Sequence, residues 1–270
     1  MRVEVSGADP RAVGADLIAA AGATASELGA PDQALADADP VAIVYGDPPL
    51  AVVTADDLHT AAARAVKACR PGGTVAWALD ASLPTPLEAQ VQALAEGAVI
   101  GGYDGRRWRS SGPPQGVERF IICGASGDLQ PVADRAALIA RWTNAARELV
   151  DAPANVVSPA GLAERATALP GLRTEVIDAR QAGLGALAAV GGSSPIDPVL
   201  IVIRHEPPGA PDAPRLTLVG KSVTFDTGGY FLKPQSDIVR QKADMGGGAA
   251  VVGAMGAIAE LGLPLAVTGV

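Results

Sequence analysis

Short apolar runs alternate with helical patterns along this 270-residue chain, and this alternation limits the fold more than any other feature. Apolar runs of about four to eight residues bounded by Gly or Pro are typical of strands. In the first half, three such runs are predicted strands, at residues 41–45, 74–79 and 120–123. Predicted helices separate them, one opening at Asp56-Asp57 with acids in its first turn and one with Pro86 in its first turn. The alternation predicts an α/β fold with a parallel or mixed sheet.

The second half continues the same alternation. A helical period runs from residue 133 to 150, and Ser158-Pro159 indicates another helix start, with a serine cap and a first-turn proline. Further strands are predicted at residues 173–178, 198–203, 216–219 and 265–270, the last three of them buried, and further helices at 182–189 and 245–261. We therefore expect a small α/β domain over residues 1–128, a linker helix over 129–150 and a second α/β domain over 151–270.

Composition and charge narrow the class of protein. The formal net charge is -8, which argues against a nucleic-acid partner bound through a general basic surface, although Arg106-Arg107-Trp108-Arg109 forms a local basic cluster. The N-terminus lacks the apolar segment of a secretory signal, and the uncharged stretch at 245–259 is short for a membrane span. Cys69 and Cys123 have no CxxC spacing, which favours a reducing compartment. We expect a soluble, cytoplasmic protein without a membrane partner.

The most conspicuous group of charges lies in a glycine-rich segment after the predicted strand at 216–219. Lys221, Asp226, Lys233 and Asp244 stand there among glycines. Glycine permits tight turns and close approach of the backbone to other groups. An apolar strand that leads into such a charged segment is more typical of a functional site than of a core.

Gly220-Lys221-Ser222 is compatible with a phosphate-binding loop at first sight, but that motif requires glycine at position 215, where arginine stands. A metal site fits better, because Asp226 and Asp244 supply the carboxylate oxygens that hard divalent cations prefer. Lys221 can ligate only as a neutral amine, whereas a protonated Lys233 can stabilise an oxyanion.

The spacing alone leaves a structural interpretation of these charges open. In that interpretation Asp244 caps a helix, Lys221 and Asp226 form an ordinary ion pair, and Lys233 and Lys242 are solvated. The remaining polar residues favour no other chemistry. His59 and His205 lack a ligand partner at metal spacing, no serine lies in a nucleophile elbow, and Asp47, Asp56 and Asp57 are typical of turns and helix starts.

Two strings of this segment closely resemble the metal-binding half-motif of the cytosolic leucyl aminopeptidase family. They are Val219-Gly-Lys-Ser-Val-Thr-Phe-Asp-Thr-Gly-Gly-Tyr-Phe-Leu-Lys-Pro and Lys242-Ala-Asp-Met-Gly-Gly-Gly-Ala-Ala-Val. The intervals of five, seven and eleven residues between Lys221, Asp226, Lys233 and Asp244 match as well. Weaker similarity extends upstream to residues 93–98 and 144–159, so the resemblance covers most of the chain.

The resemblance implies a macro-like N-terminal α/β domain, a linker helix and the first part of a mixed-sheet α/β metallopeptidase domain. It implies two divalent metal ions, manganese, zinc or magnesium. Asp226 would bridge both ions, Lys221 and Asp244 would ligate one of them, and Lys233 would be the catalytic lysine. The substrates would be peptides with a free amino terminus, with a leucine-type preference, and the assembly a homo-hexamer.

The sequence departs from the family at two places. The family's second motif, Asn-Thr-Asp-Ala-Glu-Gly-Arg, supplies a further Asp, a bridging Glu and an Arg, and it does not occur in these residues. We interpret the chain as truncated within the catalytic domain and expect it to be inactive or nearly so alone, because metal charge would be under-compensated. Whether the motif follows Val270 in the native gene stays open. Tyr230-Phe231 also stand where the family has smaller residues, which would affect the substrate pocket.

Two other functions stay open at this point. The first is a non-catalytic pseudo-enzyme or oligomer interaction subunit, which keeps the fold without the chemistry. The second is an anion- or nucleotide-binding module built on residues 1–128, although the glycine pattern there favours no such site. Metal stoichiometry separates the first alternative from an enzyme, and ligand binding by the first domain alone tests the second.

Overall fold

The computed structural model describes residues 1–270 except 38, 40, 55–56, 113–115, 208–213 and 231. The chain forms two compact units, Met1–Arg141 (unit 1) and Trp142–Val270 (unit 2). The boundary between them falls inside the long helix α5 (Gln130–Asp151), which matches the helix that the sequence predicts over residues 133–150. The division into domains at residues 128 and 150 remains a prediction.

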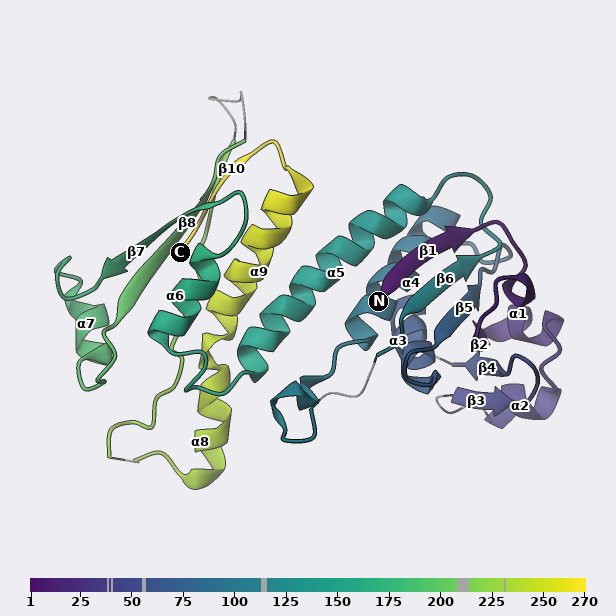
Figure 1. The fold of residues 1–270 in the computed structure, drawn as a ribbon, viewed down its shortest axis with the longest axis horizontal. Helices are drawn as coiled ribbons and strands as arrows, with labels where there is room; N and C mark the ends of the chain where they lie inside the picture. Colours follow the sequence, from purple (N-terminus) through teal and green to yellow (C-terminus); the bar gives the residue numbers. More distant parts are fainter. Residues whose placement is uncertain (38, 40, 55–56, 113–115, 208–213, 231) are drawn as a thin grey trace. The chain divides into compact units, whose positions relative to one another are not determined.

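Unit 1 is built on a six-stranded mixed sheet in the order β1-β6-β5-β2-β4-β3 (Figure 1). Every neighbouring pair is parallel except β3 and β4, which are antiparallel. The strands are β1 (Arg2–Ser6), β2 (Leu17–Ala20), β3 (Val41–Val44), β4 (Leu50–Val53), β5 (Thr74–Ala78) and β6 (Arg119–Cys123). The expected α/β fold with a parallel or mixed sheet is therefore confirmed, and the three predicted strands correspond to β3, β5 and β6.

The central strands of this sheet are buried on both faces. Trp77 and Phe120 point into a core that includes residues of α3 (Leu58–Ala68), α4 (Leu87–Gly101) and α5. Ile18 and Val52 lie in a second cluster, with residues of α1 (Gly22–Glu27) and α2 (Asp32–Asp37). Burial on both faces explains why these strands read as continuous apolar runs rather than as an alternating pattern.

Two details of the predicted helix starts are wrong. Asp57 precedes α3 as its N-cap, and its Oδ1 accepts a hydrogen bond of 2.7 Å from the Thr60 backbone N–H, so it does not lie in the first turn. Asp56 lies outside the described residues. Pro86 is the N-cap residue of α4 rather than its first helical residue. Both shifts are of one or two residues, the usual uncertainty of helix boundaries.

Unit 2 contains a four-stranded sheet in the order β7-β8-β10-β9, with β10 antiparallel to β8 and parallel to β9. Its strands are β7 (Arg173–Asp178), β8 (Val199–His205), β9 (Arg215–Leu218) and β10 (Ala266–Gly269). Its helices are α6 (Pro159–Thr167), α7 (Gly185–Gly191), α8 (Gln235–Gln241) and α9 (Gly246–Leu261), with a 3-10 turn, η3, at Lys242–Met245. Helix α6 packs on β7 and β8, and α9 packs on β8 and β10 (Figure 1). Ser158 caps α6 as predicted, whereas α7 begins three residues after the predicted start.

The prediction of a buried strand at residues 216–219 is wrong about burial. Strand β9 is the edge of its sheet, and within the described part of the chain it pairs only with β10. Leu216 is 48% exposed and Val219 78% exposed. The predicted strand at 198–203 is also less buried than expected, since Val199, Leu200 and Ile201 are only partly buried. Apolar composition thus predicted the strands but not how deeply they lie.

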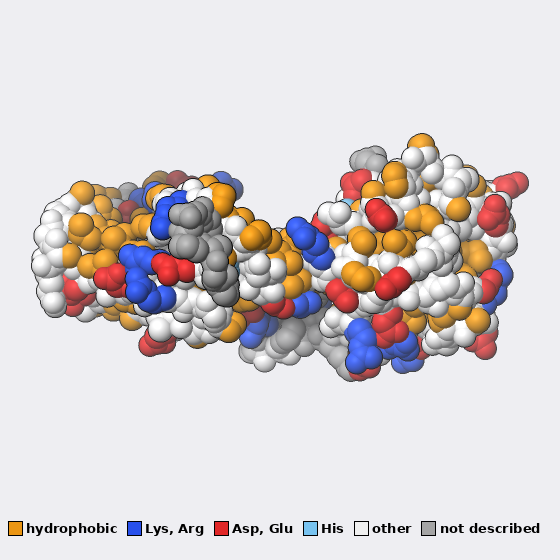
Figure 2. Space-filling view, turned by 90° about the horizontal axis from the view of Figure 1, so that it is seen from above, with side chains coloured by type: hydrophobic (Ala, Val, Ile, Leu, Met, Phe, Trp, Pro, Cys, Tyr) orange, Lys and Arg blue, Asp and Glu red, His pale blue; other side chains and the backbone are white. Residues whose placement is uncertain are grey.

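Small residues let α9 lie close to its neighbours in unit 2. A Cβ at Gly269 of β10 would lie 2.8 Å from side-chain atoms of Met255 and Val251. Gly256 faces the ring of Trp142, whose Nε1 donates a hydrogen bond of 2.7 Å to Glu260. Among the described residues, none of the helices combines the length and apolar character that a bilayer span needs. On the face drawn in Figure 2, basic and acidic side chains are intermixed.

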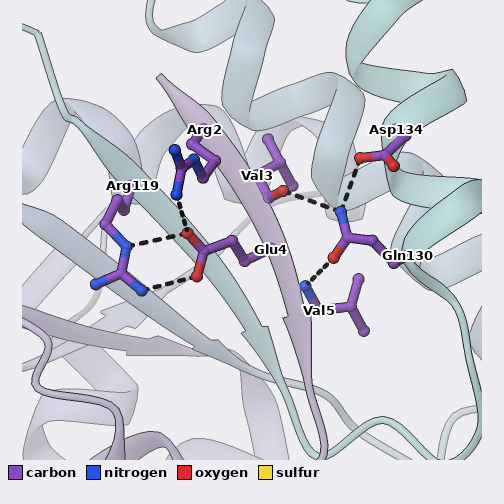
Figure 3. Close-up of polar contacts among 7 residues, drawn as sticks. All are labelled: Arg2, Val3, Glu4, Val5, Arg119, Gln130 and Asp134. Carbon is purple, nitrogen blue, oxygen red and sulfur yellow. Dashed lines mark hydrogen bonds and ion pairs between the residues drawn. The ribbon is translucent and has the colours of Figure 1, made fainter.

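The side chain of Gln130 is hydrogen-bonded to the backbone at the outer edge of β1 (Figure 3). Its Oε1 accepts a hydrogen bond of 2.8 Å from the Val5 backbone N–H, and its Nε2 donates to the Val3 carbonyl at 3.1 Å. The same Nε2 donates to Asp134 at 2.8 Å. The amide group thereby pairs with the β1 backbone as a neighbouring strand would.

Glu4 on β1 accepts hydrogen bonds from Arg119 on β6, with Nη2 at 2.7 Å from Oε2 (Figure 3). This bond is the main cause that lowers the pKa of Glu4, and burial opposes it. A carboxyl group with a lowered pKa stabilises the folded state above its unfolded pKa, and that stabilisation disappears as pH falls through the folded pKa.

We therefore expect Glu4→Gln to lower the free energy of unfolding at pH 7 by up to ~1 kcal/mol, the range of partly exposed ion pairs. At pH 3 the difference from wild type should be smaller, because the wild-type carboxylate begins to protonate. Urea denaturation at both pH values measures this. Glu27→Gln, on α1, is the matched control, and an equal Glu4→Gln difference at both pH values would contradict the prediction.

Candidate functional site

The four candidate residues lie in unit 2, on the segment after β9 and in the 3-10 turn η3 before α9. The Lys221 loop is fixed by two backbone hydrogen bonds of 2.8 Å. Gly220 N–H donates to the Val270 carbonyl, and Gly248 N–H donates to the Lys221 carbonyl. The loop is therefore held between the end of β10 and the first turn of α9.

The glycines on both sides of this contact explain why the loop can approach the helix so closely. A Cβ at Gly220 would lie 2.6 Å from the carbonyl carbon of Gly247 and 2.8 Å from Cα of Gly248. A Cβ at Gly247 would lie 3.0 Å from the Lys221 backbone nitrogen. The neighbours at Gly220 are backbone atoms, which cannot rotate aside as a side chain can. The glycine-rich start of α9 is thus a docking surface for the Lys221 loop.

Gly220→Ala should separate the Lys221 loop from α9. We expect a loss of about 2 kcal/mol in the free energy of unfolding, as for other overpacked sites. Urea denaturation followed by circular dichroism measures it. Gly185→Ala is the control, because a Cβ at this helical position meets nothing within 4 Å. Equal stability of the two variants would show that the loop and α9 can move apart freely.

Lys221 and Asp244 form an ion pair, with Nζ at 2.9 Å from Oδ2. The N-cap of α9 is Met245, and no side chain of the described residues caps that helix. The interpretation of Asp244 as a helix cap is therefore wrong. The predicted pairing of Lys221 with Asp226 is wrong as well, since the described ion pairs join each of them to another residue.

Asp226 and Lys233 close a tight loop between them. Lys233 Nζ donates to Asp226 Oδ2 at 2.9 Å and to the Asp226 carbonyl at 3.1 Å. The other carboxylate oxygen, Oδ1, accepts from the Gly228 backbone N–H at 2.7 Å. Gly228 and Gly229 have φ angles of +81° and +76°, which other residues rarely adopt. The Lys233 ammonium group is therefore hydrogen-bonded within the protein, and the interpretation that it is merely solvated is wrong.

The two ion pairs influence each other. The hydrogen bond from Lys233 is the main cause that lowers the pKa of Asp226, and the bond from Gly228 adds to it. Lys221 also lowers this pKa through its charge, as the weakest contribution. The charge of Lys221 thus acts on Asp226 as well as pairing with Asp244.

Gln241 is a member of this cluster that the sequence patterns did not reveal. Its Oε1 accepts a hydrogen bond of 2.9 Å from Lys233 Nζ. Gln241 is the last residue of α8 and stands directly before the Lys242-Ala-Asp244 string. No helix was predicted from the sequence between residues 233 and 241, so no local pattern indicated this contact. The adjacent Lys242 is half-buried, and burial lowers its pKa, so it too is not simply solvated.

The residues fit divalent cations in kind, because Asp226 and Asp244 offer the carboxylate oxygens that such ions prefer. They fall short in number. Among the described residues, no three carboxylate, imidazole or thiol side chains come together as a group able to hold a metal ion. Tyr230 is fully exposed, and Phe231, the other expected pocket residue, lies outside the described residues.

Solved structures with the same fold point to one class of protein. The bottromycin maturation enzyme BotP in complex with Mn has a TM-score of 0.77 and 31% identity, over 94% of this chain and 58% of that one. A mutant of tomato leucine aminopeptidase has a TM-score of 0.82 over 99% of this chain and 61% of that one, and its 24% identity shows the fold alone. The fold is that of an α/β metallopeptidase of the leucine aminopeptidase type.

Residues 144–270 match the cytosol aminopeptidase family, catalytic domain. A probable cytosol aminopeptidase of Nitratidesulfovibrio vulgaris is 34% identical over 265 residues, which are 86% of this chain and 52% of that protein. One of Solibacter usitatus is 39% identical over 175 residues, 63% of this chain and 36% of that protein. The chain is thus similar to cytosol aminopeptidases over most of its length, and it spans about half or less of the length of the curated relatives it matches.

Proposed function

We propose that the protein is a metal-dependent aminopeptidase that releases N-terminal residues from peptides, with a leucine-type preference, in intracellular peptide turnover. The observation that supports this most is that Lys221, Asp226, Lys233 and Asp244, joined in two ion pairs, lie within the segment that matches the family's catalytic domain. The solved structure of BotP in complex with Mn supports manganese as one candidate metal.

Each residue has a chemical role in this proposal. Asp226 and Asp244 would supply carboxylate oxygens to two divalent ions, manganese, zinc or magnesium, and Lys221 would add a neutral amine. Bound divalent ions would polarise the scissile carbonyl and supply a nucleophilic water at neutral pH. Lys233, as an ammonium group, would donate a hydrogen bond to the carbonyl oxygen and stabilise the negative charge that develops there.

We further propose that residues 1–270 hold only part of the donor set and that this chain alone hydrolyses peptides weakly or not at all. Two carboxylates compensate two divalent cations poorly. The second motif, with its Asp, Glu and Arg, would complete the site in the complete gene product. A homo-hexamer in the cytoplasm is the assembly and location that we propose for that product.

The test compares two proteins, residues 1–270 and the complete gene product that contains them. We expect the complete product to bind two Mn²⁺ per chain by elemental analysis and to hydrolyse a leucyl anilide. Residues 1–270 should bind Mn²⁺ at least about 100-fold more weakly, since even partners of metal ligands change affinity 10- to 100-fold. Robust hydrolysis by residues 1–270 would overturn the partial-site proposal. A complete product without hydrolysis or bound metal would favour the pseudo-enzyme alternative.

A further inference from the structure

The Lys233 side chain uses all its hydrogen-bonding capacity within the protein. A lysine ammonium group has three N–H donors. Three acceptors lie within 3.1 Å of Lys233 Nζ: the Asp226 carbonyl, Asp226 Oδ2 and Gln241 Oε1. Its side chain is 31% exposed, so the ammonium group is partly shielded from water. A group in this state has no donor left for a substrate carbonyl.

Of the three acceptors, only the Gln241 amide oxygen belongs to a residue that is not proposed as a metal ligand. Both Asp226 oxygens belong to a residue proposed as a metal ligand, and its carboxylate would be engaged by a cation. Gln241 is neutral, and its amide oxygen competes weakly for divalent cations against carboxylates. It comes from α8, whereas Asp226 comes from the loop before that helix.

The geometry of α8 accounts for the contact. Lys233 lies two residues before α8, and Gln241 is the last residue of that helix. The hydrogen bond of 2.9 Å from Lys233 Nζ to Gln241 Oε1 therefore joins the segment before α8 to its C-terminal end. The half-buried Gln241 thus fixes the direction of the lysine side chain from the far end of the helix.

We propose that Gln241 is a positioning residue for Lys233. Resting on the proposed aminopeptidase function, the inference is that Gln241 and the Asp226 carbonyl keep the ammonium group oriented when the Asp226 carboxylate turns to a cation. The N–H that pointed to Asp226 Oδ2 then becomes the donor for the substrate carbonyl. Without Gln241 the lysine has a single remaining anchor, and its ammonium group samples many directions.

The first experiment does not depend on activity. Acetylation of each lysine by acetic anhydride is followed by peptide mass spectrometry in wild type, Gln241→Leu and Gln241→Glu. Gln241→Leu should raise the rate at Lys233 at least threefold while the rate at Lys67 stays constant. Gln241→Glu, which keeps an acceptor, should leave it no faster than in wild type. Gln235→Leu, the same change at the opposite end of α8, is the matched control.

The second experiment measures steady-state kinetics of the complete gene product. We expect Gln241→Leu to lower kcat about tenfold with KM nearly unchanged, and Gln241→Glu to recover most of it, as second-sphere partners typically act. Equal Lys233 acetylation in Gln241→Leu and Gln235→Leu would overturn the inference. If the complete product hydrolyses nothing, the proposed function fails, while the acetylation result still decides whether Gln241 holds Lys233.

Discussion

Asp226→Asn should reduce kcat/KM of the complete gene product for a leucyl anilide by more than about 100-fold, beyond the usual effect of losing a ligand's partner. Asparagine keeps the shape of the side chain and the acceptor for the Gly228 N–H, now 2.7 Å from Oδ1. It removes the negative charge that pairs with Lys233 and that a divalent cation needs. The expected loss therefore concerns charge rather than folding.

Three measurements accompany this variant: steady-state kinetics, Mn²⁺ affinity by calorimetry and the urea midpoint. Affinity for Mn²⁺ should fall together with kcat/KM, while the urea midpoint changes little because Asp226 is 48% exposed. Asp237→Asn, an equal change of charge at an exposed position of α8, is the control and should behave as wild type. Retention of both Mn²⁺ affinity and activity in Asp226→Asn would remove Asp226 from the metal site.

Gly97→Ala should destabilise unit 1 by about 3 kcal/mol. Helices α3 and α4 touch where Gly97 faces the backbone of His59, and a Cβ there would lie 2.7 Å from the His59 carbonyl carbon and 2.8 Å from its Cα. One turn further, a Cβ at Gly101 would lie 2.7 Å from the Ala63 Cβ. The gain of up to ~1 kcal/mol in helix propensity from glycine to alanine is smaller than this overlap costs.

Gly102→Ala, at the end of the same helix, is the control for that prediction. A Cβ there meets its nearest atoms at 3.5 Å, which is ordinary contact, and the φ angle of -72° suits alanine. We expect a change within about 0.5 kcal/mol. Urea denaturation followed by circular dichroism compares the two variants. Similar stabilities of the two variants would mean that α3 and α4 can separate without loss.

The sequence predicted the kind and order of many elements because their signals are local. Apolar runs between Gly and Pro located β3, β5 and β6, and the Ser158-Pro159 pair located the start of α6. Sequence patterns did not reveal that β9 is an exposed edge strand. That property depends on which strands lie beside it, and β10, its partner, comes about fifty residues later in the chain.

The candidate site was predicted from its residue types and intervals, but its pairing was not. Spacing located the charges on one glycine-rich segment, whereas the ion pairs join Lys221 to Asp244 and Lys233 to Asp226. The first pair depends on Gly220 lying against Gly247, a contact that brings α9 to the loop and has no local signal. Gln241 was not predicted as a site residue either, because glutamine at a helix end is common and its partner, Lys233, is eight residues away.

The hydrogen bonds of the Gln130 amide also reduce the tendency of the chain to self-associate through β1. A free strand edge can pair with a strand of another molecule. Such aggregation is most frequent while a chain is unfolded or partly folded. By occupying the Val5 N–H and the Val3 carbonyl, Gln130 leaves a second β1 fewer groups to pair with. Gln130 is the first residue of α5, so its hydrogen bonds to β1 form only when that helix packs on the sheet. The helix therefore limits edge pairing of β1 in addition to covering the core.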